Sequence, residues 1–484
     1  MLKCPKFRYV FALYAAVVSY VCVFMMYPTH DDWNYAAPHP NMNLLTRLMP
    51  GAVMWRPFDR LFEYLLGYVP SLFPYVNHVV SMAGHFALCL VLYALLKRLT
   101  HNRTGACLGT LCFCLSPGIV ITITNSDFMN QIWAMVTGIT AAFFFFRARL
   151  SGRLRYYVLW LLFAFVSVLV KENGIVWFIA PAMLYSVYSF MNGGRLTDTV
   201  KANFVYFLIG AAGIIVYFCI RFSLLGDIVL GEPTSEQRYM LNFSPLHIIR
   251  NYSLMIGGAV TSIDTLAVFL KPRNYPVIFI TGMISVAFLC VILACVYNIF
   301  KTNRKLFYSL IGLFVCAGFI SSPYAVMGYN AESTAYEMAF MFGIIFGIIL
   351  SSCRWPRKSS AVLVLMFVSM ILVLGHKFYV MHNYTRSVYD FIAEHSSEFV
   401  NIPQKVHIYF IEDVPMEGYS TYTYPIGHGL GRGKAFNSVW NWKADFTVKT
   451  VSSDADIDFT PASLSEYDTV FSLTRSGTLK VLRN

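Results

Sequence analysis

The sequence is short of charged residues. Only 13% of its 484 residues are charged and 57% are hydrophobic, whereas a soluble domain has about 25% charged and about 45–50% apolar residues. This shortage excludes a soluble multidomain protein, although the length alone would suit about three soluble domains. Because the apolar residues form long blocks separated by basic clusters, the chain is predicted to be an all-α polytopic membrane bundle.

Several other signatures are missing. The first apolar block, residues 7–27, ends in His-Asp-Asp-Trp without a small-residue cleavage site, which favours a retained helix over a signal peptide. Most of the eleven cysteines lie inside apolar runs, so no disulfide framework is expected. The glycine-rich segment 427–433 fits neither dinucleotide-binding nor P-loop spacing and is interpreted as a mobile loop.

The charge that is present is mostly positive. The formal net charge is +12, but the basic residues gather next to apolar blocks, which is typical of cytoplasmic loops and not of a nucleic-acid-binding surface. These clusters are at 3–8, 97–103, 147–155, 195–201, 301–305 and 354–358. We therefore expect a cytoplasmic N-terminus, and nucleic acid is not an expected partner.

A membrane span needs about 20 apolar residues, and the sequence predicts eleven spans within residues 1–379. They are 7–27, 76–96, 105–123, 128–146, 156–170, 174–191, 203–223, 276–299, 306–326, 336–353 and 360–379. Two loops, 28–75 and 224–275, then lie on the outer side. The first contains short amphipathic stretches such as 60–66, and the second contains the apolar stretch 254–270, which we interpret as interfacial or re-entrant.

The tail, residues 380–484, has a different pattern. Alternation predicts strands at 405–411, 446–451, 469–473 and 478–482, and a helix is predicted at 388–399. This pattern indicates a small α/β domain on the outer, extracytoplasmic side.

Polar residues that could carry chemistry cluster on this outer side. Asp31 and Asp32 follow the first span directly, where a carboxylate can take a proton from a hydroxyl group; the alternative is a solvated loop with an N-cap aspartate. His30 and the two aspartates offer metal-ligand types without a known ligand spacing, so a divalent metal stays open.

The second and fifth predicted spans add further polar residues. His78 and His85 lie in the second span, where a histidine more often bonds a neighbouring helix than a ligand. Lys171 and Glu172, followed by Asn173, lie between two short spans; they either anchor a helix end or line a shared polar cavity.

These residues together resemble the GT-C class of membrane glycosyltransferases. The resemblance rests on Asp31-Asp32-Trp33, on Trp55-Arg56-Pro57-Phe58 with the later histidines, and on Lys171-Glu172-Asn173-Gly174. It is strongest to the protein O-mannosyltransferase branch and to bacterial enzymes that use polyprenyl-phosphate sugars. It covers roughly residues 1–200, and beyond them it is architectural.

The resemblance implies an inverting transferase that moves a sugar from a polyprenyl- or dolichyl-phosphate to an acceptor hydroxyl of a protein or glycan outside the cytoplasm. It assigns the base to Asp31 or Asp32, with Asp31 favoured. The bacterial inner membrane is a better expected location than the endoplasmic reticulum. Expected substrate-binding residues are Trp33, Arg56, His78, His85, Lys171, Glu172, Arg221, Arg238 and Arg250.

Two rival classes remain. A transporter or flippase of lipid-linked sugars would show similar halves and broken helices near the middle of the membrane. A structural or sensing protein would keep its function in the tail. The crowding of polar clusters on one face favours the enzyme.

Overall fold

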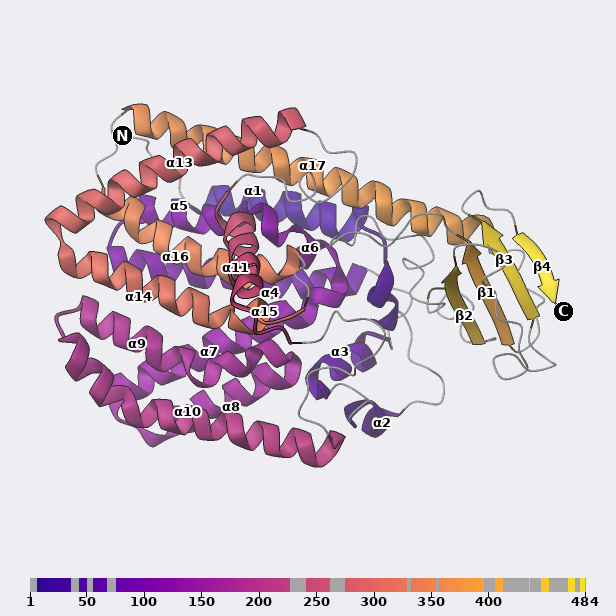
Figure 1. The fold of residues 1–484 in the computed structure, drawn as a ribbon, viewed down its shortest axis with the longest axis horizontal. Helices are drawn as coiled ribbons and strands as arrows, with labels where there is room; N and C mark the ends of the chain where they lie inside the picture. The colour runs from indigo at the N-terminus through magenta and orange to yellow at the C-terminus, as the bar shows by residue number, and fades with distance from the viewer. Residues whose placement is uncertain are drawn as a thin grey trace.

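The computed structural model describes residues 7–35, 43–49, 55–67, 75–226, 241–261, 275–328, 332–353 and 357–395, residue 435, and four strands near the C-terminus. Within these residues, seven helices are long and apolar enough to cross a membrane, or nine if each of two bent pairs is one span. The chain is therefore an integral membrane protein, and its main body is an all-α bundle as predicted (Figure 1).

Each predicted span coincides with a helical segment, but the count of eleven full-length spans is not supported. The seven long helices are α1 continued by η1 (Phe7–Tyr20, Val21–Met25), α4 (Tyr75–Thr100), α7 (Met129–Ser151), α10 (Leu196–Leu225), α13 (Tyr275–Thr302), α16 preceded by η8 (Glu332–Ala335, Tyr336–Ser352) and α17 (Arg357–His395). Two others, α8 (Leu154–Val170) and α14 (Arg304–Ile320), have 17 residues each. At 1.5 Å per residue they are about 26 Å long, short of a hydrocarbon core of about 30 Å.

The two remaining predicted spans are bent. The first is α5 (Arg103–Cys114) followed by η4 (Pro117–Ile119) and α6 (Val120–Thr124), with a 50° bend, and the second is η6 (Glu172–Phe178) followed by α9 (Ala180–Met191), with a 43° bend. A hydropathy pattern sums apolar residues along a window, so it does not detect a break within the window. The breaks at Pro117 and Glu172 therefore appear only in the fold.

Short helices cap the bundle. They are η2 (His30–Tyr35), α2 (Leu44–Leu48), α3 (Pro57–Gly67), η5 (Ser126–Phe128), α11 (Pro245–Val260), α15 (Ser322–Ala325) and η8 (Glu332–Ala335). The amphipathic stretch 60–66 forms part of α3. Figure 1 shows α11 running up and down the picture while α13 and α14 run across it, so α11 crosses their direction. Residues 262–270 of the predicted interfacial stretch lie outside the described residues.

Helix α16 forms the centre of the bundle. Its span is buried along its whole length, because Gly343 and Gly347 allow α5 to approach closely. A Cβ atom on Gly109 of α5 would lie 2.6 Å from both the Gly343 carbonyl oxygen and the Gly347 Cα. Small residues four apart allow such backbone contact between helices in a membrane.

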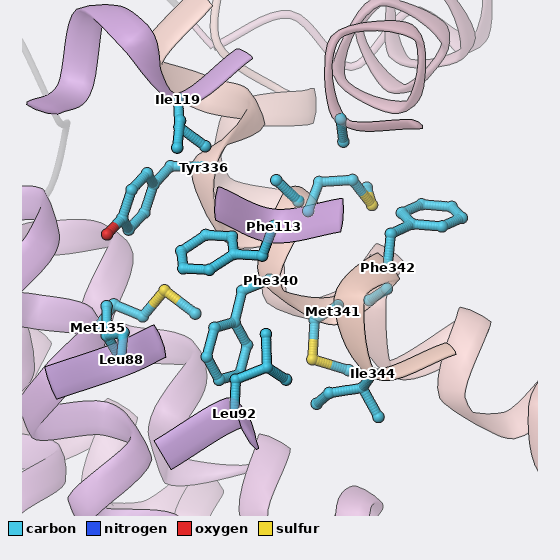
Figure 2. Packing of buried hydrophobic residues seen from close by; sticks show 14 of the residues in the cluster. Leu88, Leu92, Phe113, Ile119, Met135, Tyr336, Phe340, Met341, Phe342 and Ile344 are labelled. Atoms are coloured by element: carbon cyan, nitrogen blue, oxygen red, sulfur yellow. The ribbon is translucent and has the colours of Figure 1, made fainter. Parts of the chain in front are cut away.

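Aromatic packing fills the space beside this contact (Figure 2). The Phe113 ring of α5 lies 5.5 Å from the Tyr336 ring and 5.4 Å from the Phe340 ring, both edge-on. Edge-to-face aromatic pairs are favourable at this separation. The α5–α16 pair is therefore a rigid support for the polar groups above it.

The break between α5 and α6 is closed by a buried ion pair. Lys377 of α17 donates a hydrogen bond of 2.7 Å to the Pro117 carbonyl oxygen, and its ammonium group also pairs with Glu332 of η8. Ser116 adds a hydrogen bond to the Gly258 carbonyl oxygen of α11. A backbone carbonyl released by a helix break thus obtains a charged donor inside the bundle.

The tail forms a four-stranded sheet of β1 (Lys405–Ile411), β2 (Asp445–Val451), β3 (Thr469–Thr474) and β4 (Leu479–Arg483), in the order β2-β1-β3-β4. Strand β1 pairs parallel with β2 and β3, whereas β4 is antiparallel to β3. All four strands lie where the alternation predicts them. Figure 1 shows the sheet beyond the end of α17, away from the bundle.

The predicted boundary at residue 380 falls inside a helix. Helix α17 has 39 residues, about 58 Å of length, so it is longer than a membrane span and continues toward the sheet. The predicted tail helix 388–399 is mostly the end of α17 and not a separate element. An α/β domain with a helix of its own stays a prediction, and the glycine-rich segment 427–433 lies outside the described residues.

Candidate functional site

Charged side chains from distant parts of the chain meet at one end of the bundle. Helix α3 contacts η2 and α8, η2 contacts η5, and η6 contacts α10. These elements supply both acidic and basic groups, and each is a short segment or a helix end. The site is therefore assembled where the long helices stop.

Glu172 is the centre of this cluster. Lys171 has an extended backbone (φ −155°, ψ 139°), which ends α8 and places the following carboxylate at the helix junction. Arg56, just before α3, donates from Nε to Glu172 Oε2 at 2.6 Å. Arg221 Nη1 of α10 lies 3.9 Å from Glu172 Oε1. Two arginines thus share one carboxylate, and the structure brings together three residues that the sequence predicts for the site.

Lys171 is the third cation. Its Nζ donates to Gln131 Oε1 at 3.3 Å and lies 5.2 Å from the centre of the Phe128 ring. Burial, together with repulsion by the Arg56 guanidinium, lowers the pKa of Lys171 to about 8. A pKa in this range means that the charge on Lys171 responds to pH near neutrality.

A second carboxylate lies behind Lys171. Glu337 Oε2 accepts 2.9 Å from Gln131 Nε2, and Glu337 Oε1 accepts 2.7 Å from Asn173 Nδ2. Asn173 Nδ2 also donates to the Tyr324 hydroxyl at 2.7 Å. This network holds the Lys-Glu-Asn turn against α16. The sequence does not predict it, because Gln131 and Glu337 look like isolated polar residues within apolar blocks.

Asp32 has a structural environment. Its Oδ1 accepts 2.8 Å from Ser126 Oγ and 2.7 Å from the Asp127 backbone N–H, and its Oδ2 accepts 3.0 Å from the Thr29 backbone N–H. Oδ1 holds η2 against η5, and Oδ2 is bonded to the backbone just before η2, so Asp32 is better suited to positioning than to proton transfer. Trp33 is buried beside it. The Asp31 side chain lies outside the described residues, and its role as base stays a prediction.

Asp127 is another carboxylate that the sequence analysis does not predict for the site. It is half-buried, and its backbone N–H is fixed by Asp32 and by Asn125 Oδ1 at 2.9 Å. Its charge raises the pKa of both Arg56 and Lys171, after larger causes in each case. The available signal is the polar triplet Asn125-Ser126-Asp127, which separates two apolar blocks on the predicted outer side.

Asp59 joins η2 to α7. The Tyr35 hydroxyl donates to Asp59 Oδ1 at 2.9 Å, and Asn130 Nδ2 donates to Oδ2 at 3.3 Å. Burial raises the pKa of Asp59, although Arg56 and these hydrogen bonds oppose the rise. On α3, Glu63 pairs with Arg47 at 2.9 Å and with Arg60 at 2.7 Å.

The remaining predicted residues separate into three groups. His85 is fully partnered: its Nε2 lies 2.8 Å from the Tyr14 hydroxyl and its Nδ1 lies 2.8 Å from the Tyr336 hydroxyl, so no ring nitrogen is left for a ligand. His78 is buried and has no hydrogen-bond partner among the described residues. Arg250 is exposed on α11, and Arg238 lies outside the described residues.

The charged groups of this site can bind anionic groups and exchange protons. Within the residues that the structure describes, no three histidine, cysteine, aspartate or glutamate side chains gather in a metal-binding arrangement. The site contains two arginines, Arg56 and Arg221, that pair with Glu172. The neighbouring elements add the carboxylates of Asp32 and Asp127. No family model and no curated protein matches this chain.

Proposed function

We propose that this protein is an integral-membrane, inverting glycosyltransferase of the GT-C kind. It takes one sugar from a polyprenyl or dolichyl phosphate and passes it to a hydroxyl group of a protein or glycan on the extracytoplasmic side. The observation that carries this proposal is the meeting of Arg56 and Arg221 at Glu172, with Lys171 close to Arg56, at the end of a bundle that also presents Asp127.

The cations suit the leaving group of such a reaction. When the bond between the sugar carbon and the phosphate oxygen breaks, the electron pair goes to the phosphate, which is stable as an anion and needs no proton. Arginine can bind phosphate oxygens with two parallel hydrogen bonds. A preorganised cation in a partly desolvated site stabilises developing charge more than water does. Arg56, which is partly exposed, is the best placed of the three.

The carboxylates suit the acceptor side. The attacking hydroxyl must lose its proton, and one carboxylate near the sugar carbon is enough for this step. Asp32 positions η5 through its hydrogen bonds, so we assign proton removal to Asp127 or Asp31. The sugar carbon would lie between this base and the phosphate held by Arg56, and a single displacement there inverts its configuration.

The proposed topology follows the basic clusters. The basic last turns of α4, α7 and α13 contain Lys97, Arg149 and Lys301, and we assign them to the cytoplasm. The site, loops 28–75 and 224–275, and the residues after α17 then lie outside. Eleven membrane segments, two of them short and two bent, are compatible with this arrangement.

The test is transfer of labelled sugar from a purified polyprenyl-phosphate sugar by the purified full chain. Arg56→Ala is expected to reduce the rate about 10²- to 10³-fold, as the loss of one electrostatic donor commonly does. Arg155→Ala, an exposed arginine at the other end of the bundle, is the control and should keep normal turnover. Transfer from a soluble nucleotide sugar only, or normal turnover of Arg56→Ala, would show the proposal to be wrong.

The base is tested separately. Asp127→Asn and Asp31→Asn should identify it, because the loss of a general base costs about 10²- to 10⁴-fold in rate. Asp32→Asn is the structural comparison, since it weakens the contact between η2 and η5. If both Asp127→Asn and Asp31→Asn transfer sugar normally, neither residue is the base.

A second candidate function is supported by the two bent helix pairs. Broken helices are common in transporters, and the bends at Pro117 and Glu172 are of 50° and 43°. Movement of a lipid-linked sugar across vesicles by Arg56→Ala, without any sugar transfer by the unaltered protein, would favour this function. Both breaks are held by local contacts, Lys377 at one and Arg56 at the other, which fits a fixed site better than a moving one.

A further inference from the structure

Two histidines of helix α4 differ sharply in their surroundings. His78 and His85 are seven residues apart, so they lie on the same face of the helix, and both are buried, with exposed fractions of 1% and 0%. His85 contacts the hydroxyls of Tyr14 and Tyr336. Neither ring nitrogen of His78 has a hydrogen-bond partner within the described part of the chain.

Two polar groups next to His78 are likewise buried without a hydrogen-bond partner. Asn77 Nδ2 and Ser81 Oγ are also buried and have no partner in the described residues. Buried donors and acceptors of this kind are nearly always satisfied, by protein, by a ligand or by water. Three of them within two turns of one helix therefore indicate that something polar binds beside α4.

The position of His78 connects it with the candidate site. Trp133 Nε1 of α7 donates to the Val80 carbonyl oxygen of α4 at 3.2 Å, which places the first turns of these two helices at the same level. Asn130, one turn before Trp133, donates to Asp59. Helix α4 also contacts η5, the segment held by Asp32. His78 thus lies in the first turn of α4, next to the elements that carry Asp32 and Asp59.

The chemistry of the three side chains selects the class of ligand. An imidazole, an amide and a hydroxyl are uncharged in their ordinary states and combine donors with acceptors. A sugar hydroxyl, which both donates and accepts, is their complement. Phosphate oxygens only accept, so a phosphate would leave the acceptors of these side chains unmatched and is better bound by the arginines. A sugar ring bound here would direct its hydroxyls toward α4.

We infer that His78, with Asn77 and Ser81, forms the subsite for the hydroxyl groups of the transferred sugar, separate from the cations that bind the phosphate. This inference rests on the proposed function, because it divides one lipid-phosphate sugar between two sets of residues. It makes His78 a residue of sugar recognition and Arg56 a residue of phosphate recognition.

The experiment uses the full chain in detergent and two ligands, polyprenyl phosphate and polyprenyl phosphate mannose, with polyprenyl phosphate glucose as a second sugar. His78→Phe keeps the size of the side chain and removes both ring nitrogens. It is expected to bind polyprenyl phosphate normally, to bind at least one sugar-bearing lipid about 10-fold more weakly than the unaltered protein, and to show no loss of Tm. Two lost hydrogen bonds account for an effect of this size.

The control is His85→Phe, which leaves the Tyr14 and Tyr336 hydroxyls without a partner and should lower Tm without changing the preference for the sugar-bearing lipid. If His78→Phe binds the lipids with and without sugar as the unaltered protein does, His78 contacts only water and the inference is wrong. If the unaltered protein binds none of these lipids, the proposed function fails and the sugar subsite fails with it.

Discussion

Glu332 and Glu172 each face a basic side chain from a distant part of the chain, Lys377 and Arg56 respectively. Around Glu332 the charges balance one to one: the Lys377 ammonium group is fully buried, and it also donates to the Pro117 carbonyl oxygen. Around Glu172 two arginines approach one carboxylate and Lys171 lies next to it. Arg56 and Glu172 keep 21% and 12% of their side-chain surface exposed.

The two ion pairs differ in burial and in the balance of charge. The Lys377–Glu332 pair stabilises a break in a helix and is buried away from solvent. A cluster in which cations share an acid, and in which part of the surface is open, can exchange that acid for another anion. Burial and charge balance together distinguish the Lys377–Glu332 pair from the Glu172 cluster. Neither property can be read from the residue types alone.

The largest expected loss of stability follows substitution of Lys377, which pairs with Glu332. Lys377→Met leaves the Glu332 carboxylate buried without a cation, and losses of this kind cost about 3–5 kcal/mol of stability. Thermal unfolding in detergent should show a large fall in Tm. The double variant Lys377→Met/Glu332→Gln should recover part of the loss, because no charge then stays buried alone. A double variant as unstable as the single one would contradict the view that the charge pair matters.

A smaller loss of stability is expected when Glu172 is substituted. Glu172→Gln removes the charge that Arg56 and Arg221 share, but the partly exposed Arg56 keeps access to water, so the loss should be below about 2 kcal/mol. Polyprenyl phosphate should raise the Tm of this variant more than that of the unaltered protein, because the lipid phosphate replaces the missing carboxylate.

The control for Glu172→Gln is Glu63→Gln, which also removes a carboxylate shared by two arginines, Arg47 and Arg60. It should lose stability without any added response to polyprenyl phosphate. An equal response in both variants would mean that the Glu172 cluster is no special phosphate site, and the comparison would fail.

The smallest expected effect is the response of Lys171 to pH. Because burial lowers its pKa from 10.5 to about 8, Lys171 loses its charge as the pH rises through about 8. If this charge helps to bind the donor, KM for the lipid-phosphate sugar should increase several-fold between pH 7 and pH 9 while kcat changes less. Lys171→Arg, which stays charged, should remove this dependence.

The lowered pKa of Lys171 also affects the free energy of unfolding, which it makes larger as the pH rises. Between pH 8 and pH 10.5 the unfolded chain binds more protons at Lys171 than the folded protein does, so this group makes stability increase with pH in that window. Lys171→Met should abolish its contribution. A decrease of stability through this window that disappears in Lys171→Met would show that the direction assigned to the pKa is wrong.

Much of the architecture could be predicted from the sequence. Apolar length is a local property, so residues 7–27, 76–96 and 276–299 identify membrane helices without any knowledge of their neighbours. The strand alternation in the tail is equally local, and all four strands lie where it places them. The crowding of polar residues at helix ends also points to the end of the bundle where the charged side chains meet.

The pairing of side chains could not be predicted. Arg56 and Glu172 are 116 residues apart and Lys377 lies 260 residues after Pro117, and no spacing rule relates such positions. Asp127 looks like a loop residue until Asp32 fixes its backbone, and His85 and His78 look alike until one is seen between two tyrosines. Sequence determines which segments enter the membrane, because hydrophobicity acts along the chain. Only the tertiary structure decides which charges meet, because Coulomb and hydrogen-bond contacts act across space.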